Sequence, residues 1–190
     1  MANTRWAWFG LLAALATPLL LRRGFVDYAA EMGFARRYFG LRSNAYAAPL
    51  LATGSVRYGL LDSLTLEGHA EGGAGLANLG AGLAVQLGGL GVAGVSTSAS
   101  REKGRQGALT SVVFDSRFAG VYVSAMAIRA TSGYRDLASA TAIQSWRDVR
   151  GDADTPPREV NQVTLSAPID LTPYRRGGDP ATFSLSYSDQ

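Results

Sequence analysis

Apolar and polar residues alternate along most of the chain after Gly24. The alternation predicts β-strands, because successive side chains of a strand point to opposite faces. The clearest run is residues 64–71, with Leu64, Leu66, Gly68 and Ala70 on one side and Thr65, Glu67, His69 and Glu71 on the other. Residues 79–87, 121–127 and 182–188 repeat the pattern. Strands of this kind have one face in an apolar medium and the other in water.

Short polar or glycine-containing segments separate these runs and predict the connections between strands. Pro156 and Pro157 exclude their segment from a sheet interior. The pattern yields roughly eight or nine strands of about ten residues each, the length that transmembrane antiparallel strands require. Short connections are predicted at 61–63, 88–89 and 117–120, and longer polar ones at 102–107, 147–158 and 173–180.

The predicted fold class is all-β, an antiparallel transmembrane β-barrel or a part of its wall. Soluble sandwiches and lipocalin-like barrels also contain alternating strands. Two features favour the membrane: the strands are long, and the polar face is rich in small residues, which a wide water-filled lumen permits. Tyrosines near strand ends predict an interfacial girdle, namely Tyr28, Tyr58, Tyr122, Tyr134 and Tyr187.

Alternation also predicts which side chains face water inside the barrel and which face lipid. A β-bulge would invert the assignment for every residue beyond it in that strand. The predicted lumen-facing residues are Arg57, Thr65, Glu67, His69, Glu71 and Gln86. The predicted lipid-facing residues are Leu64, Leu66, Leu83, Val85, Val123 and Leu185.

Residues 1–17 are expected to be an apolar leader, distinct from a barrel domain at residues 18–190. The apolar run from Trp6 to Leu21 would form a short helix. It is shorter than the roughly 20 residues that a membrane-spanning helix needs. Residues 14–16, Ala-Leu-Ala, resemble the exit of a secretory signal peptide. The alternative is a start codon inside a longer gene, with a leader that is not native to the family.

Composition argues against an enzyme and against a cofactor or metal site. The chain has no cysteine and only one histidine, which excludes a cysteine nucleophile, a thiolate metal site and a multi-histidine cluster. Its net charge is +3 and its arginines are dispersed, which argues against nucleic-acid binding. It contains 23 glycines, and only 17% of its residues are charged, against roughly 25% in soluble domains. This balance is typical of a membrane β-barrel.

Two patterns resemble chemical sites. The glycine clusters at 72–75 and 88–91 resemble phosphate-binding loops, but such a loop must open a helix, and each cluster is followed by another alternating run. They are interpreted as hairpin turns. Glu67, His69 and Glu71 share one strand face, an arrangement open to metal ligands or acid–base residues, but they lack convergent partners from other segments. A water-exposed row on a barrel wall is the favoured interpretation.

Several segments resemble, in the same order, segments of the fimbrial outer-membrane ushers, which secrete and assemble pili by the chaperone–usher route. Residues 18–28 (PLLLRRGFVDY) are similar to the strand that follows the usher plug domain. Residues 54–68 (GSVRYGLLDSLTLEG) are similar to a hairpin of the wall. Further similar segments are 79–82 (LGAG), 87–91 (LGGLG), 133–138 (GYRDLA), 163–166 (VTLS) and 184–187 (SLSY).

The resemblance implies a fragment of the usher barrel and leaves no room for the family's periplasmic N-terminal domain, plug or C-terminal domains. It implies part of a pore in the bacterial outer membrane that secretes and assembles pilus subunits. The implied partners are outer-membrane lipid, pilus subunits and periplasmic chaperone–subunit complexes. The alternative is a small self-contained outer-membrane β-barrel of the porin or adhesion type. A soluble secreted sandwich is a third possibility.

Overall fold

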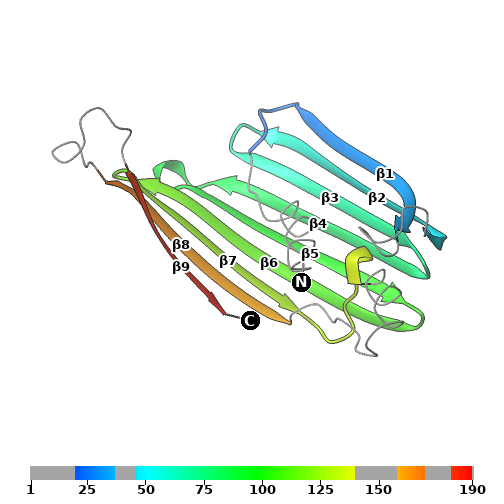
Figure 1. Cartoon of the computed structure of the whole chain (residues 1–190). Helices are drawn as coiled ribbons and strands as arrows, with labels where there is room; N and C mark the ends of the chain where they lie inside the picture. Colours follow the sequence, from blue (N-terminus) through cyan, green and yellow to red (C-terminus); the bar gives the residue numbers. More distant parts are fainter. Residues whose placement is uncertain (1–19, 37–45, 140–157, 170–180, 190) are drawn as a thin grey trace.

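A computed structural model describes residues 20–36, 46–139, 158–169 and 181–189. Within these ranges, nine strands form one antiparallel sheet in which each strand pairs with its neighbours in sequence (Figure 1). The all-β antiparallel prediction is confirmed. The strands are β1 (Val26–Arg36), β2 (Tyr46–Leu61), β3 (Leu64–Gly73), β4 (Leu76–Gln86), β5 (Val92–Glu102), β6 (Arg105–Phe118), β7 (Val121–Ala130), β8 (Glu159–Ile169) and β9 (Ala181–Asp189).

The register carries the alternation across the whole sheet and gives it two distinct faces. Glu67 lies opposite Arg57 on β2 and Gly82 on β4, so side chains on one face meet across strands. We call the polar face the one that carries Asp27, Arg57, Thr65, Glu67, His69, Glu71, Asn78, Ser98, Ser111, Thr164 and Ser186. We call the apolar face the one that carries Tyr28, Val56, Leu66, Leu79, Leu83, Val95, Val112, Val163 and Leu185.

Large hydrophobic side chains are exposed on the apolar face. The exposed fraction is 78% for Tyr28, 76% for Met32 and 67% for Leu79. Contiguous apolar patches of more than a few hundred Å² are rare on soluble proteins and mark membrane or partner surfaces. The apolar face therefore requires an apolar neighbour, as a lipid-facing barrel wall does.

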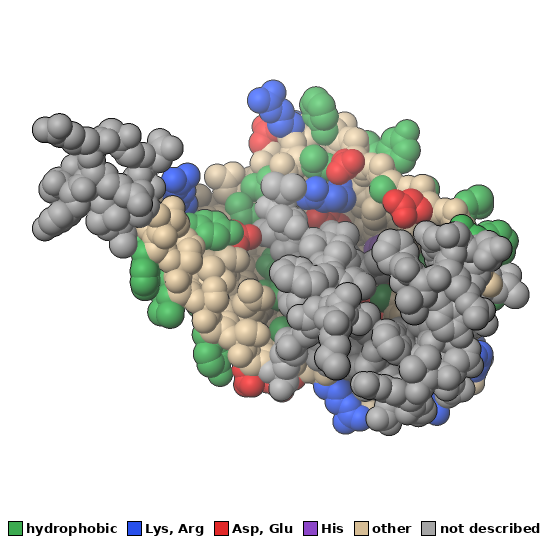
Figure 2. Space-filling model, viewed as in Figure 1, with side chains coloured by type: hydrophobic (Ala, Val, Ile, Leu, Met, Phe, Trp, Pro, Cys, Tyr) green, Lys and Arg blue, Asp and Glu red, His purple; other side chains and the backbone are tan. Residues whose placement is uncertain are grey.

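The polar face changes in character along the sheet. Figure 2, in the view of Figure 1, shows a mainly uncharged polar surface over β8 and β9, with hydrophobic side chains along its outer edge. Thr164 and Ser186 lie within 3.3 Å there, and Ser166 and Ser184 within 2.9 Å, as cross-strand hydroxyl pairs. Over β1 to β3 charged side chains of both signs gather instead (Figure 2).

Three hairpins close with two-residue turns in which both residues have positive φ. Positive φ at both positions is what a type I′ turn requires, and glycine fits the second position without strain. The predicted long connection at 102–107 is therefore wrong, because the turn is only Lys103–Gly104 and both strands extend to it. The three turns are Ala74–Gly75, Lys103–Gly104 and Ala119–Gly120.

Two further connections between consecutive strands are also short. Asp62 and Ser63 join β2 to β3, and the 3₁₀ turn η1 (Gly88–Leu90) lies between β4 and β5, as the glycine clusters predict. Three predicted segments lie outside the described residues: the leader at 1–17, residues 147–157 of one long connection, and the loop at 173–180. In the part of the chain that is described, no helix is both long and apolar enough to span a membrane.

All described strands belong to a single layer, so the second sheet of a soluble sandwich is not found among them. A cluster of buried hydrophobic residues lies on the polar face and contains Leu109, Ile128, Tyr134 and Val160. Tyr134 comes from the segment after β7, so this core forms where the chain folds back over the sheet.

The predicted tyrosine girdle is only partly correct. Tyr28, Tyr58 and Tyr187 are exposed on the apolar face. Tyr134 is instead 4% exposed. Tyr122 lies on the polar face, where its hydroxyl donates to Asp115 at 2.7 Å. Proximity to a strand end does not by itself fix which face a tyrosine occupies.

Candidate functional site

Residues 131–139 fold back from the end of β7 across the polar face; we call them the crossing segment (Figure 1). The segment first continues the pairing of β7 with β6. The Thr131 amide donates to the Ala108 carbonyl, and the Ala108 amide donates to the Thr131 hydroxyl, both at 2.9 Å. These two bonds fix the point at which the chain leaves the strand.

Two glycines allow the crossing segment to pass close to β6. A Cβ on Gly107 would lie 2.0 Å from the Tyr134 nitrogen, and a Cβ on Gly133 would lie 2.0 Å from the Gln106 carbonyl oxygen. No other residue could occupy either position without moving backbone. Some glycines of this chain are therefore required because two backbone segments touch there, and others because they form turns.

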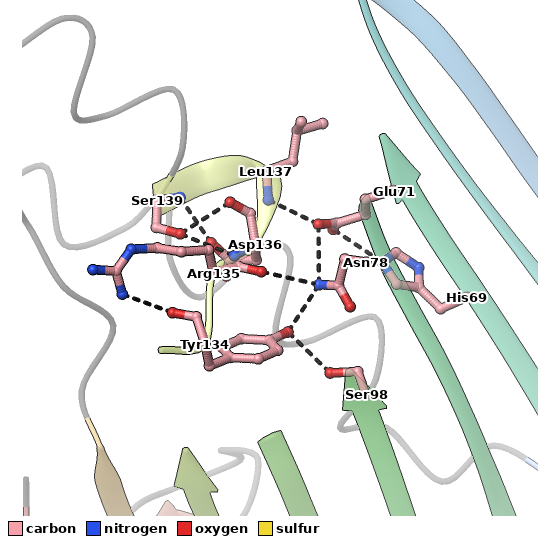
Figure 3. Close-up of polar contacts among 9 residues, drawn as sticks. All are labelled: His69, Glu71, Asn78, Ser98, Tyr134, Arg135, Asp136, Leu137 and Ser139. Carbon is pink, nitrogen blue, oxygen red and sulfur yellow. Dashed lines mark hydrogen bonds and ion pairs between the residues drawn. The ribbon is translucent and has the colours of Figure 1, made fainter. Parts of the chain in front are cut away.

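Tyr134 anchors the segment over β4 and β5 (Figure 3). Its hydroxyl oxygen accepts hydrogen bonds from Asn78 Nδ2 and from Ser98 Oγ, each at 3.0 Å. Asn78 is 1% exposed, so these bonds lie in a buried site. Burial raises the pKa of Tyr134, and the two hydrogen bonds partly oppose that effect. The phenol is therefore neutral, and its oxygen is bonded to side chains of β4 and β5.

Main-chain groups of the segment are also bonded to side chains of the sheet. The Arg135 amide donates to Ser100 Oγ at 2.8 Å. The Leu137 amide donates to Glu71 Oε2 at 2.8 Å. Together with Tyr134, these bonds reach three strands, β3, β4 and β5. A hydrogen bond that involves a charged group is stronger than a neutral one, which makes Glu71 a central anchor.

A helical turn at residues 137–139 begins with a reciprocal cap. Asp136 Oδ1 accepts the Ser139 amide at 2.7 Å, and Ser139 Oγ accepts the Asp136 amide at 2.9 Å. This is the geometry of a capping box, with aspartate at the N-cap and serine at N3. Burial raises the pKa of Asp136, while the bonds from Ser139 work in the opposite direction.

The predicted row of Glu67, His69 and Glu71 divides between an ion pair of Glu67 and a contact between His69 and Glu71. Glu67 bonds Arg57 at 2.9 Å. His69 Nε2 lies 2.9 Å from Glu71 Oε1, and the Glu71 side chain is only 1% exposed. The interpretation of the row as fully water-exposed is thus wrong at Glu71, because the crossing segment covers it. Its two oxygens bond the imidazole and the Leu137 amide.

All six residues predicted to face the lumen lie on the polar face, but they do not form one site. Thr65 is fully buried and accepts the Leu21 amide at 2.8 Å, because the chain before β1 crosses the polar face there. Gln86 lies exposed at the end of β4. The six predicted lipid-facing residues lie on the apolar face.

Sequence reasoning did not identify the residues that hold the crossing segment. The missed residues are Asn78, Ser98, Ser100, Tyr134, Arg135, Asp136 and Ser139. One local signal was available, since aspartate followed three residues later by a capping partner marks a helix start. The cross-strand partners carry no such signal.

Comparison with known proteins finds a match among solved structures. No protein-family model and no curated protein matches the chain. The P pilus usher (PapC) translocation pore matches 89% of the chain with a TM-score of 0.67 and 25% identity. An E. coli P pilus tip assembly intermediate, PapC-PapD-PapK-PapG, matches 90% with a TM-score of 0.69 and 24% identity.

The chain spans 32% of the first matched protein chain and 20% of the second. The match confirms the resemblance to the fimbrial ushers. The fold of the described strands is that of a segment of an usher barrel wall.

Proposed function

We propose that this chain forms part of the wall of an outer-membrane usher pore that secretes and assembles pilus subunits. One observation carries the proposal: a nine-stranded sheet with one exposed apolar face matches the translocation pore of the P pilus usher. The role is transport and assembly, with no catalytic step. The proposed location is the bacterial outer membrane.

The polar face lines the lumen, and the apolar face contacts lipid. Lipid-facing and lumen-facing residues alternate along the strands of such barrels. The lumen-facing set includes Arg57, Thr65, Glu67, His69, Glu71 and Gln86. Ion pairs and hydroxyl pairs on that face satisfy polar groups beside water, whereas the exposed leucines, valines and tyrosines of the other face are stable only in hydrocarbon.

The wall belongs to a wide pore rather than to a small closed barrel. Among the described strands, β1 and β9 each pair on one side only, and a membrane barrel cannot leave such edges unpaired. A barrel of about eight strands fills its interior with side chains. The serines and threonines over β8 and β9 are too small to do so, which disfavours the self-contained barrel.

The proposed partners are pilus subunits and their periplasmic chaperone complexes. The second matched structure is an assembly intermediate that contains PapC together with PapD, PapK and PapG. We extend that kind of assembly to the present chain as part of a complete usher. Subunits would pass along the uncharged hydroxyl surface of β8 and β9, where few charges need to lose water.

Single-cysteine labelling tests the proposed faces. The chain has no native cysteine, so every introduced thiol is unique. Neighbouring residues provide matched pairs: Ser186→Cys and Thr164→Cys on the polar face, Leu185→Cys and Val163→Cys on the apolar face. In intact outer membranes, a charged, membrane-impermeant maleimide is expected to label the first two variants and spare the others. Equal labelling of all four contradicts a membrane wall.

Photo-cross-linking tests the transport role separately. A photoreactive amino acid at position 164 is expected to cross-link to pilus subunits when these are co-expressed with their chaperone. The same group at position 163 is the matched control and should react with lipid instead. Correct thiol labelling without any subunit cross-link would show a membrane barrel with another function.

A further inference from the structure

Arg101 places a positive charge on the mostly apolar face at the end of β5. Arg101 lies in register with Ala77 on β4 and with Gln106 on β6. Charged residues on the lipid side of a barrel are costly at mid-membrane and tolerated near the interface. Arg101 therefore marks the level of the lipid headgroups at the end of the sheet where Lys103 and Gly104 form the turn.

A groove lies beside this arginine. Its volume is about 630 Å³, and its lining includes Ala77, Leu79, Ala99, Ala108 and Arg101. The alanines have short side chains and form the floor, whereas Leu79 is 67% exposed and projects beside them. The depression thus has an apolar floor and a cationic end.

Arg101 differs from the other arginine on this face. Arg129 is bonded to Glu159 at 2.7 Å and to Asn161 at 3.0 Å, so its charge is already compensated. Within the described ranges, Arg101 is exposed and has no acidic partner. A guanidinium at headgroup level is complementary to phosphate, which it can bind through two parallel hydrogen bonds.

We propose that this groove binds a phosphorylated lipid of the outer leaflet, lipopolysaccharide, with an acyl chain over Ala99 and Ala108 and a phosphate at Arg101. The inference rests on the proposed location in the outer membrane. The longest connection, residues 131–158, leaves from this end of the sheet. Longer loops of outer-membrane barrels are extracellular, which places Arg101 in the outer leaflet.

Lipid binding by the complete usher that contains this chain, purified in dodecyl maltoside, tests the site, with native mass spectrometry as the readout. The probes are bisphosphorylated lipid A, dephosphorylated lipid A and phosphatidylglycerol. Arg101→Ala is expected to weaken lipid A binding about tenfold, the loss of one strong charge-assisted contact. Arg105→Ala is the matched control, because Arg105 lies at the same end but on the polar face. Ala99→Phe fills the floor, keeps Arg101, and should also weaken binding.

The other outcomes contradict either the lipid site or the membrane wall on which the site rests. Equal losses in Arg101→Ala and Arg105→Ala would indicate diffuse charge attraction. Equal binding of dephosphorylated lipid A would exclude the phosphate contact, and tighter binding of phosphatidylglycerol would exclude the outer-leaflet source. Failure of the labelling pattern at Leu185 and Ser186 contradicts the membrane wall itself. Correct labelling without lipid preference contradicts only the lipid site.

Discussion

Removing the hydroxyl of Tyr134 should release the crossing segment without altering the sheet. Tyr134→Phe keeps the ring in the buried cluster but deletes the acceptor of two hydrogen bonds, each of 3.0 Å. A buried hydrogen bond contributes about 0.5–1.5 kcal/mol net, so the change should cost about 1–3 kcal/mol. Since about 1.4 kcal/mol is tenfold, opening of the segment should increase roughly 5- to 140-fold.

Amide hydrogen exchange of residues 131–139 measures this opening directly, because the Arg135 and Leu137 amides are bonded to the wall. Protection in that peptide should fall, while protection of the β8–β9 hairpin stays constant. Tyr122→Phe is the matched control, since Tyr122 lies at the opposite end of β7 from the segment and its hydroxyl donates to Asp115. A change of less than twofold in Tyr134→Phe, or an equal change in the control, would refute the assigned role of the hydroxyl.

Three further predictions address the same architecture. Gly107→Ala should displace the segment at a cost of about 1–3 kcal/mol, as overpacking does, whereas Gly89→Ala, with open space around its Cβ, should not; protection of the 131–139 peptide distinguishes them. Because burial raises the pKa of Asp136, its contribution to docking is complete below the ordinary carboxyl value and lost as pH rises through the raised value. Exchange corrected for intrinsic rates should therefore show more opening at the higher pH, and Asp136→Asn should flatten that dependence. Val112→Arg, in the middle of β6 on the apolar face, should destabilise the folded barrel by about 2–4 kcal/mol in urea titrations in lipid vesicles, and no loss would contradict lipid contact there.

The sequence predicted the sheet and its two faces because both follow from local alternation. The period of two at residues 64–71 or 182–188 needs no knowledge of distant residues. The turn at Lys103–Gly104 was missed because lysine rarely takes positive φ, so the polar stretch around it resembled a longer loop.

The crossing segment could not be predicted in the same way, since its partners are remote in sequence. Tyr134 meets Ser98 and Asn78, which are 36 and 56 positions away. Periodicity states which face a side chain occupies, but not what covers that face. Glu71 was therefore placed on the correct side of its strand while its burial went unforeseen.

The crossing segment has a mechanical consequence for the wall. From β7 to β3 the segment spans four strand spacings, about 19 Å along the sheet. The seven residue steps from Ala130 to Leu137 can reach about 23–25 Å when fully extended. The reach of the segment therefore exceeds the span by only a few Å, so the segment joins β7 to β3 across the curved wall with little spare length. Any flattening of the curve would stretch its bonds to Ser98, Ser100 and Glu71, so this sector should be stiff while β8 and β9 remain free to flex.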